Sequence, residues 1–240
     1  MSAQRVDSQP AYVIHARPYR ETSLLIEALT LDHGRVGLVA RGAARPKSAL
    51  RALLQPFVPL HLSWQGNGEL KTLRSAEPAG MVRRPDGRAA LSGLYLNELL
   101  QRLLPRDDGH PELFSAYVDA MQGLIFPESV EVCLRRFEMR LLDALGYGLV
   151  LDHEPLNGEA IVPEAAYDYD PHGGPRRTSA GLGLNLRGAS LANMAANRFD
   201  DETTRADAKR LLRQVLRTHL GERPLKSREL FQGLAARKQV

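Results

Sequence analysis

The sequence predicts a mixed α+β protein, in which a small N-terminal five-stranded β-barrel precedes a mainly α-helical C-terminal part. In about the first 75 residues, apolar and polar side chains alternate, which is typical of short strands. From about residue 88 the apolar side chains recur with a helical period of about 3.6 residues. The length of 240 residues is enough for two domains that each have a hydrophobic core.

The strand pattern occurs in five short runs. They cover residues 12–16, 24–28, 36–40, 58–64 and 70–73. Asp-His-Gly at 32–34 separates the second run from the third, and Gly34 can adopt the left-handed conformation of a hairpin turn. Gly-Asn-Gly at 66–68 separates the last two runs. Five antiparallel strands in this length indicate an OB-fold, a barrel that often binds single-stranded nucleic acid, over residues 1–80.

Residues 81–240 are predicted to form the helical domain. Helices are expected over about 91–103, after Pro111, over about 129–145 and over about 204–220, with a weaker helical pattern from about residue 190. The first of these helices has a face predicted to be buried, formed by Leu91, Leu94, Tyr95, Leu99 and Leu103. Thr204 and Asp207 fit a capping pair at the start of the last helix. Proline, glycine and acidic residues predict an irregular acidic insertion over about 151–188, with at most a small hairpin between 166–170 and 182–186.

Positive charge is concentrated near both ends of the chain. The net charge is +4, but residues 1–80 contain ten Lys and Arg against six Asp and Glu, and residues 205–240 contain ten against three. Two basic ends favour polyanions or acidic proteins as partners. The alternative is that an arginine-rich sequence simply has a basic, solvated surface.

The sequence also bounds the location of the protein. A single cysteine, Cys133, excludes an internal disulfide. The first ten residues lack the apolar core of a signal peptide, and no apolar run approaches the roughly 20 residues of a membrane span. We therefore expect a cytoplasmic protein that has no membrane partner.

A basic cluster on the predicted barrel is the main candidate site for DNA. Four of its residues lie within eleven positions that contain no acid, and three come from neighbouring strands or turns. The candidate DNA-binding residues are Arg17, Arg20, Arg35, Arg41, Arg45, Lys47 and Arg51. Together they can follow a phosphate backbone, although the same residues could simply form a solvated loop. Aromatic side chains are sparse here, so we expect electrostatic binding without sequence preference.

A second basic feature is a stripe along the last predicted helix, where Arg205, Lys209, Arg213 and Arg217 recur every four residues. Such a stripe commonly does no more than solubilise a helix.

No catalytic or cofactor site is predicted. The seven histidines are scattered, and the glycines at 181, 183 and 188 do not have the spacing of a dinucleotide-binding motif. Residues 152–154 with Asp168, Asp170 and His172 could in principle bind a metal, but acidic loops of this kind are usually only solvated. We therefore expect a protein that is not an enzyme and has no cofactor and no structural metal.

Six segments together resemble the RecO family of bacterial DNA repair and recombination mediators. They occur in the family's order and are ARPYRETSLLIEALTLDHGRVGLVARGA, LQPFVPL, ELKTLRSAEP, GLYLNELLQRLL, LRRFEMRLLDALGYG and LGERPLKSRELF. The resemblance implies an OB-fold with a helical C-terminal domain, binding of single- and double-stranded DNA, strand annealing and a nucleoid-associated location. It also implies partnership with RecR and contact with the acidic C-terminal tail of single-stranded DNA-binding protein, so that RecA can be loaded onto covered strands.

The resemblance also suggests the partner-binding residues. Arg135 and Arg136 match the family segment implicated in holding the acidic tail, and Phe137 and Arg140 lie on the same predicted helix. Lys226 and Arg228, in the last matching segment, complete the candidate set. The alternative is that these arginines only balance acidic residues of their own helix. In both cases replacing Arg135 by alanine is expected to leave stability almost unchanged, because exposed ion pairs contribute at most about 1 kcal/mol.

One departure from the family concerns zinc. Many relatives have a four-cysteine zinc site just after the GYG motif, whereas residues 151–200 here contain no cysteine, so a zinc-free variant is implied. The rival function is a non-enzymatic scaffold that binds only acidic protein partners.

Overall fold

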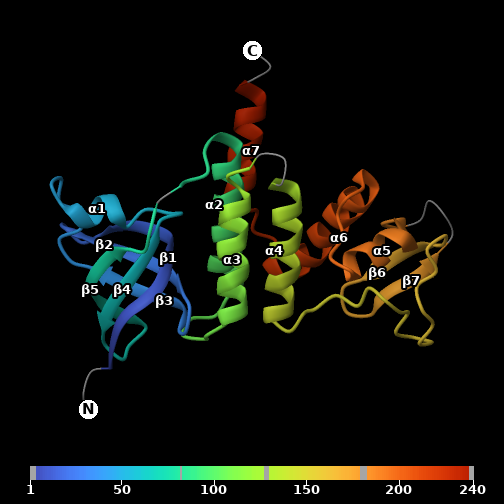
Figure 1. The fold of residues 1–240 in the computed structure, drawn as a ribbon, viewed down its shortest axis with the longest axis horizontal. Helices are drawn as coiled ribbons and strands as arrows, with labels where there is room; N and C mark the ends of the chain where they lie inside the picture. The colour runs from blue at the N-terminus through green and yellow to red at the C-terminus, as the bar shows by residue number, and fades with distance from the viewer. Residues whose placement is uncertain (1–3, 82, 127–129, 179–182, 238–240) are drawn as a thin grey trace. The chain divides into compact units, whose positions relative to one another are not determined.

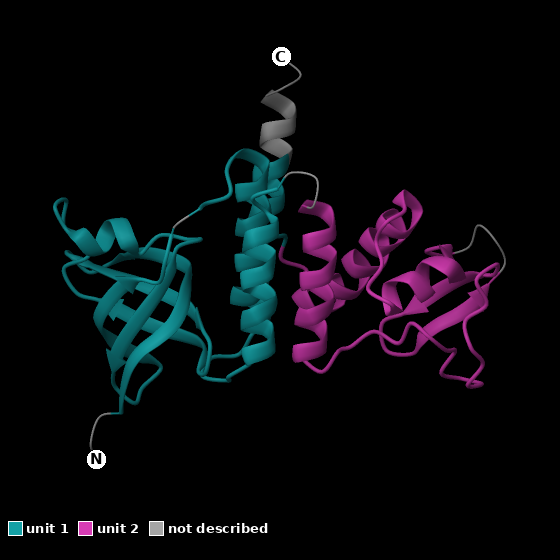
Figure 2. Ribbon diagram, in the orientation of Figure 1, with its two compact units in different colours: residues 1–127, 224–240 teal, residues 128–223 magenta. Residues whose placement is uncertain are grey.

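The computed structural model describes residues 4–81, 83–126, 130–178 and 183–237 of the chain. It divides into two compact units (Figure 2). Unit 1 comprises Met1–Pro127 and Pro224–Val240, and unit 2 comprises Glu128–Arg223. The predicted boundary near residue 80 separates the barrel from the first long helix, whereas the compact units place that helix together with the barrel.

Unit 1 contains the barrel (Figure 1). Its five strands are β1 (Arg5–Tyr19), β2 (Ser23–Thr30), β3 (Gly34–Ala40), β4 (Pro59–Gln65) and β5 (Leu70–Pro78), and the short helix α1 (Ala49–Leu53) lies between β3 and β4 in the chain. The strands form a closed barrel in the order β1-β2-β3-β5-β4. All pairings are antiparallel except that of β3 with β5, which is parallel. The predicted OB-fold is therefore confirmed.

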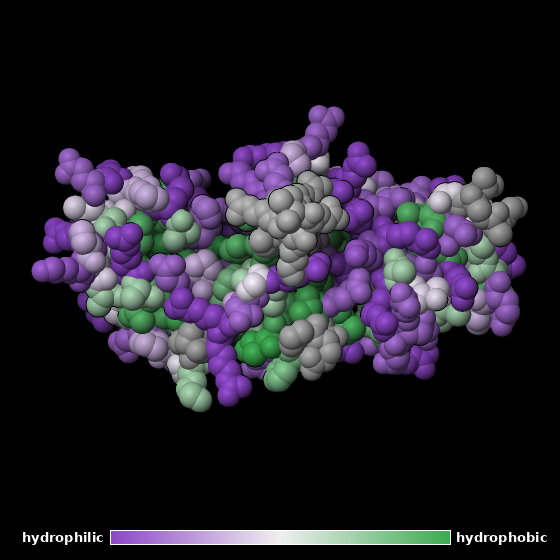
Figure 3. Space-filling view, turned by 90° about the horizontal axis from the view of Figure 1, so that it is seen from above, coloured by the Kyte–Doolittle hydropathy of each residue, from purple (hydrophilic) through white to green (hydrophobic). Residues whose placement is uncertain are grey.

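Alternating side chains fill the barrel. Val13, Ile26, Leu38 and Leu60 are completely or almost completely buried, and so is Trp64, the single tryptophan. They belong to one apolar cluster to which all five strands contribute. Hydrophilic side chains cover most of the molecular face shown in Figure 3, as the alternation predicts for a barrel with a solvated outer surface.

Three helices complete unit 1. They are α2 (Gly87–Leu103), α3 (Pro111–Gly123) and α7 (Lys226–Arg237), and α2 packs against both β1 and α7. Of the five residues on the predicted apolar face of α2, Leu99 is buried and the other four are partly buried. The face that is buried includes Gly93, where an added Cβ would lie 2.6 Å from the ring of Phe57. A small residue is needed at this contact, and an apolar pattern does not predict it.

A cluster of ion pairs fixes the loop after α2 to the barrel. The buried carboxylate of Glu27 pairs with Arg106, and its Oε2 lies 3.3 Å from Nη1 of Arg35. Nε of Arg35 donates to the carbonyl oxygen of Leu104 at 2.8 Å, and Nζ of Lys71 lies 2.5 Å from Oδ1 of Asp107. This cluster ties β2, β3 and β5 to the segment between α2 and α3.

Unit 2 combines three helices with a small sheet. The helices are α4 (Val130–Ala144), α5 (Gly188–Ala195) and α6 (Glu202–Leu220). The sheet has the order β7-β6-β8 and consists of β6 (Ala166–Asp170), β7 (Gly174–Thr178) and β8 (Leu186–Arg187). The predicted irregular insertion is thus partly ordered. Its hairpin joins β6 to 174–178, and the predicted partner segment 182–186, of which residue 182 lies outside the described residues, pairs with β6 only through Leu186. Tyr167 and Tyr169 of β6 are buried, which stabilises the sheet through apolar packing.

The predicted cap of the last long helix is also wrong. Asp201 is the N-cap residue of α6, and its Oδ1 accepts a hydrogen bond from the backbone nitrogen of Thr204 at 2.8 Å. Asp207 is buried one turn further along and is used elsewhere: its Oδ2 accepts a hydrogen bond from the backbone nitrogen of Arg187 at 3.1 Å.

Candidate nucleic-acid interface

Backbone pairing brings two segments of the predicted basic cluster to the same end of the barrel. Tyr19 at the end of β1 pairs with Ser23 at the start of β2, and Leu24 pairs with Ala40 at the end of β3. The backbone nitrogen of Ala44 donates to the carbonyl oxygen of Thr22 at 2.9 Å. The β1–β2 turn and the segment that leads from β3 into α1 therefore meet. We call this the basic end of the barrel.

Six of the seven candidate DNA-binding residues come from these segments. Arg17, Arg20, Arg41, Arg45, Lys47 and Arg51 are all exposed. Within the part of the chain that the structure describes, none of the six has an acidic oxygen within ion-pair distance. The guanidinium carbon of Arg20 lies 5.2 Å from the ring centre of Tyr19. Glu21, in the β1–β2 turn itself, is exposed as well.

Arg35 lies elsewhere. It stands at the start of β3, at the opposite end of the barrel, and its side chain is only 16% exposed. Its guanidinium group is engaged by Glu27 and by the carbonyl oxygen of Leu104. A sequence pattern cannot distinguish this arginine from an exposed one, because its partners are 8 and 69 positions away.

The opposite end of the barrel carries most of the acidic residues. They include Asp32 in the β2–β3 turn, Glu69 before β5, and Asp107 and Asp108 in the loop that contacts β3. Basic side chains also lie at this end, but they have partners: Arg5, Arg35, Lys71 and Arg106 are ion-paired, and Arg74 donates to Gln65. Basic side chains that have no ion-pair partner among the described residues are therefore concentrated at the basic end, which favours the approach of a polyanion there.

Three further basic residues follow the barrel in the chain and were not singled out from the sequence. They lie after β5, which runs parallel to β3 and continues beyond its paired residues Leu70–Thr72 to Pro78. Arg83, Arg84 and Arg88 follow within ten positions of the last residue of β5, and all three are exposed. The signal for them in the sequence is their position between the last strand and the first helix, next to a basic barrel.

The six candidate partner-binding residues do not form one site within either unit. Arg135, Arg136, Phe137 and Arg140 belong to α4 in unit 2, whereas Lys226 and Arg228 belong to α7 in unit 1. Of the four candidates on α4, Arg136 and Arg140 are exposed. Phe137 is 1% exposed, so its ring fills the interior.

Arg135 is buried, which corrects the expectation that it lies at an exposed edge. Its Nη1 lies 2.9 Å from Oε2 of Glu138, one turn along the helix, and Glu138 is 1% exposed. The pair is therefore an interior ion pair and not a surface pair.

The basic stripe of α6 is also partly engaged. Nη1 of Arg205 donates to the carbonyl oxygens of Phe199 and Asp200 at 2.9 and 2.7 Å, and Nζ of Lys209 lies 3.6 Å from Oε1 of Glu131. Arg213 and Arg217 remain exposed.

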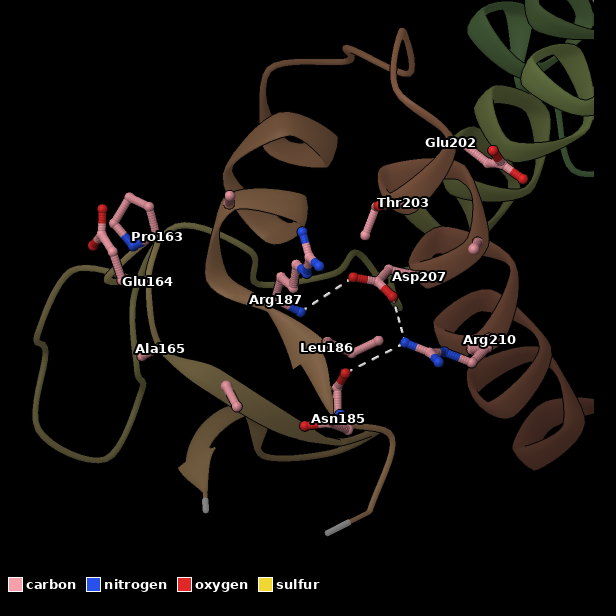
Figure 4. A pocket seen from close by; sticks show the side chains of 13 residues that line it. Pro163, Glu164, Ala165, Asn185, Leu186, Arg187, Glu202, Thr203, Asp207 and Arg210 are labelled. Atoms are coloured by element: carbon pink, nitrogen blue, oxygen red, sulfur yellow. Dashed lines mark hydrogen bonds and ion pairs between the residues drawn. The ribbon is translucent and has the colours of Figure 1, made fainter. Parts of the chain in front are cut away.

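Figure 4 shows a hollow of about 760 Å³ in unit 2, between β8 and the start of α6. Asp207 pairs with Arg210 there, and Nη2 of Arg210 donates to the carbonyl oxygen of Asn185 at 3.3 Å. The side chains of Asp207 and Arg210 thus bind backbone groups of Arg187 and Asn185 at the outer edge of β8, where no further strand pairs. Glu164 and Glu202 also line the hollow, so its charges do not favour an anionic ligand.

No group of three or more His, Cys, Asp or Glu side chains in the described ranges is arranged to hold a metal ion. The segment before β6 is held by Arg177, whose Nη2 lies 3.2 Å from Oε1 of Glu154 and 3.7 Å from Oε2 of Glu159. Among the described helices, none combines the length and the apolar character needed to cross a bilayer.

A closed OB-fold barrel with one basic end, followed by helices, defines a class of candidate nucleic-acid-binding proteins. Residues 2–82 match the family model "Recombination protein O N terminal", and residues 84–229 match "Recombination protein O C terminal". The chain therefore belongs to the RecO family, and the resemblance noted from the sequence is confirmed.

Similar proteins cover almost the whole chain. "DNA repair protein RecO" of Methylococcus capsulatus is 49% identical over 95% of this chain and 93% of its own length. The protein of the same name from Azoarcus sp. is 46% identical over 96% of this chain and 97% of its own, and that of Nitrosococcus oceani is 47% identical over 96% and 94%.

Proposed function

We propose that this protein acts in DNA repair and recombination as a non-enzymatic mediator, and that the basic end of its barrel binds single- and double-stranded DNA. The observation that carries the proposal is the set of six exposed basic side chains without ion-pair partners among the described residues, on a barrel whose opposite end carries most of the acidic residues. Family membership supports the role in repair.

The chemistry of the basic end favours contact with phosphates over contact with bases. Guanidinium and ammonium groups neutralise phosphates and release condensed counterions, which stabilises binding whatever the sequence. Tyr19 is the aromatic residue of the β1–β2 turn region, and its ring lies beside Arg20, so stacking platforms are few. A strand held by its backbone keeps its base edges accessible, and neutralised phosphates repel a second strand less. Both effects promote annealing of complementary strands.

The protein partners belong to the same proposal. As the resemblance implies, RecR and the acidic tail of single-stranded DNA-binding protein would bind this chain, which would help to load RecA in the cytoplasm at the nucleoid. Exposed arginines suit such a tail, because a guanidinium group binds a carboxylate in a two-pronged geometry. Arg136 and Arg140 are the exposed arginines of α4, and Nε of Arg136 donates to Oδ1 of Asn197 at 3.2 Å. They form the candidate site for the tail in unit 2.

The first prediction tests DNA binding. A variant in which Arg41, Arg45, Lys47 and Arg51 are all replaced by alanine should bind a single-stranded oligonucleotide more weakly at low salt. Each phosphate contact contributes about 0.7 to the slope of log K against log salt concentration for single strands, so the slope should fall by up to about 3. Fluorescence anisotropy with oligonucleotides of several sequences, over a salt series, measures both quantities.

The control is a double variant at the other end of the barrel, Arg5→Ala with Arg74→Ala. Arg5 pairs in the sheet with Gln65, and Nη1 of Arg74 lies 3.4 Å from Oε1 of Gln65. Its salt slope should stay close to that of the wild type. An unchanged slope in a folded quadruple variant, or an equal fall in the control, would contradict the proposal. A wild-type protein that binds no DNA at any salt concentration would favour the scaffold for acidic proteins instead.

A further inference from the structure

The start of α7 is held by a carboxylate from another helix. Oε1 of Glu98, on α2, accepts a hydrogen bond from the backbone nitrogen of Lys226 at 2.9 Å. Oε2 accepts from the backbone nitrogen of Ser227 at 2.9 Å and from its hydroxyl at 2.7 Å. Nη1 of Arg102, one turn further along α2, donates to the carbonyl oxygen of Pro224 at 3.3 Å. Glu98 therefore caps α7 in the way an N-cap side chain does, although it lies more than 120 positions away in the sequence.

The attachment of α7 also affects the pKa of Glu98. Burial alone would raise the pKa of this carboxyl, but the hydrogen bonds from Ser227 and Lys226 hold the pKa below its usual range. The carboxylate form is thus the one that docks α7. The positive charge of Arg102 also lowers the pKa of Glu98.

Docking brings the first turn of α7 close enough to the barrel for a charge on the helix to act on a side chain of β1. The side chains of Lys226 and Arg228 are exposed. The charge of Lys226 acts on the ring of His15, which lies two residues before Arg17 on β1. Burial lowers the pKa of His15 most, Glu27 opposes this, and the charges of Arg17 and Lys226 lower it further. α2 packs against both α7 and β1, so Lys226 and Arg17 act on the same histidine although they lie at opposite ends of the sequence.

We propose that the first turn of α7, through Lys226 and Arg228, is a second phosphate-binding element that continues the basic end of the barrel, and that Glu98 is its positioning residue. The inference rests on the proposed DNA binding, and it assigns Lys226 and Arg228 to DNA instead of to a protein partner.

The local charge balance supports a polyanion as the ligand. Glu98 is occupied by the backbone of α7, and Glu27 is occupied by Arg35 and Arg106. Glu229 is exposed in the first turn of α7 and reduces the positive charge there, but Arg17, Lys226 and Arg228 exceed it. The bonds to Glu98 hold the backbone of the helix start, so little backbone entropy is lost when Lys226 and Arg228 bind phosphates.

The test asks whether a substitution that removes a negative charge strengthens or weakens DNA binding. Glu98→Ala removes a negative charge from a protein that binds a polyanion, and general electrostatics predicts tighter DNA binding. If Glu98 positions Lys226 and Arg228, the variant should instead bind single-stranded DNA about three- to tenfold more weakly at low salt, with a smaller salt slope. The matched control is Glu112→Ala, which removes an exposed acid from the first turn of α3 in the same unit and should bind as the wild type or slightly tighter.

A second pair of measurements separates positioning from general loss of structure. Lys226→Ala with Arg228→Ala should weaken binding to a similar extent, and adding Glu98→Ala to that variant should have almost no further effect. Adding an oligonucleotide to the wild type should raise the pKa of His15, followed by NMR, because a nearby phosphate stabilises the imidazolium form.

Three results would overturn the inference: wild-type affinity in the folded Lys226/Arg228 double variant, unchanged or tighter binding by Glu98→Ala, or an unshifted pKa of His15. If the quadruple variant of the barrel still loses affinity in that case, DNA binding by the barrel stands and only the role of α7 is rejected. If neither variant loses affinity, both proposals fail.

Discussion

Replacing Gly34 by alanine should destabilise the protein by about 3–5 kcal/mol, close to the upper limit for a single substitution. Gly34 has a φ of +59°, in the left-handed region where a side chain costs about 1–2 kcal/mol. An added Cβ would also lie 1.7 Å from the carbonyl oxygen of Asp108, which is a backbone atom that cannot move without displacing its loop. That loop is the one fixed to the barrel through Glu27 and Lys71.

Gly42→Ala is the matched control, because Gly42 has a φ of +70° but its Cβ would have no atom nearer than 3.9 Å. It should lose only the backbone cost of about 1–2 kcal/mol. Urea unfolding of both variants at the same pH measures the difference. Equal losses in the two variants would mean that the contact between β3 and the loop after α2 is not as close as the structure shows.

Replacing Arg135 by alanine should cost about 3–5 kcal/mol, because it removes the ion-pair partner of a buried carboxylate. Glu138 is 1% exposed, so water cannot replace the guanidinium group. The expectation from the sequence was almost no change, since arginines on a helix with acidic neighbours usually form exposed pairs. Thermal or urea unfolding distinguishes the two outcomes directly.

Two comparisons sharpen this prediction. Arg136→Ala, next in the chain but exposed, should cost less than about 1 kcal/mol. The apolar double variant Arg135→Met with Glu138→Leu should be near the wild type, because apolar residues of similar volume often replace a buried ion pair without loss. A small loss in Arg135→Ala would contradict the buried pair. For the same reason, Arg136→Ala and not Arg135→Ala is the variant suited to measuring the affinity for an acidic tail peptide.

The barrel could be predicted well from the sequence, because the pattern that specifies each strand lies within a short stretch of neighbouring residues. In β3, for example, Val36, Leu38 and Ala40 recur at every second position and are buried, and the turn before them contains Gly34 with a positive φ. The helices α3 and α6 were predicted for a similar reason. In α6, for example, Leu211, Leu212 and Val215 recur on one buried face.

The remainder depends on contacts between distant positions. The buried face of α2 contains Gly93 because Phe57 packs there. No helix was predicted after Gly221, because the start of α7 is capped by Glu98, which is distant in the sequence. The six arginines and lysines at the basic end were found as a cluster along the chain, but Arg35 was included wrongly with them. The register of β2 and β3 places Leu29 opposite Arg35. Glu27 lies two positions before Leu29 in β2, on the same face of the strand, so its carboxylate reaches the guanidinium group of Arg35.

The central claim is that DNA binds at the basic end of the barrel and not at the opposite end. Photo-crosslinking tests it most directly, with a photoreactive amino acid introduced in place of Lys47 in one protein and of Asp32 in another, each mixed with a labelled single-stranded oligonucleotide. Lys47 lies in the exposed segment before α1, and Asp32 lies in the β2–β3 turn at the opposite end. We expect strong, salt-sensitive crosslinking from position 47 and little from position 32. Crosslinking that is equal from both positions, or stronger from position 32, would contradict the account.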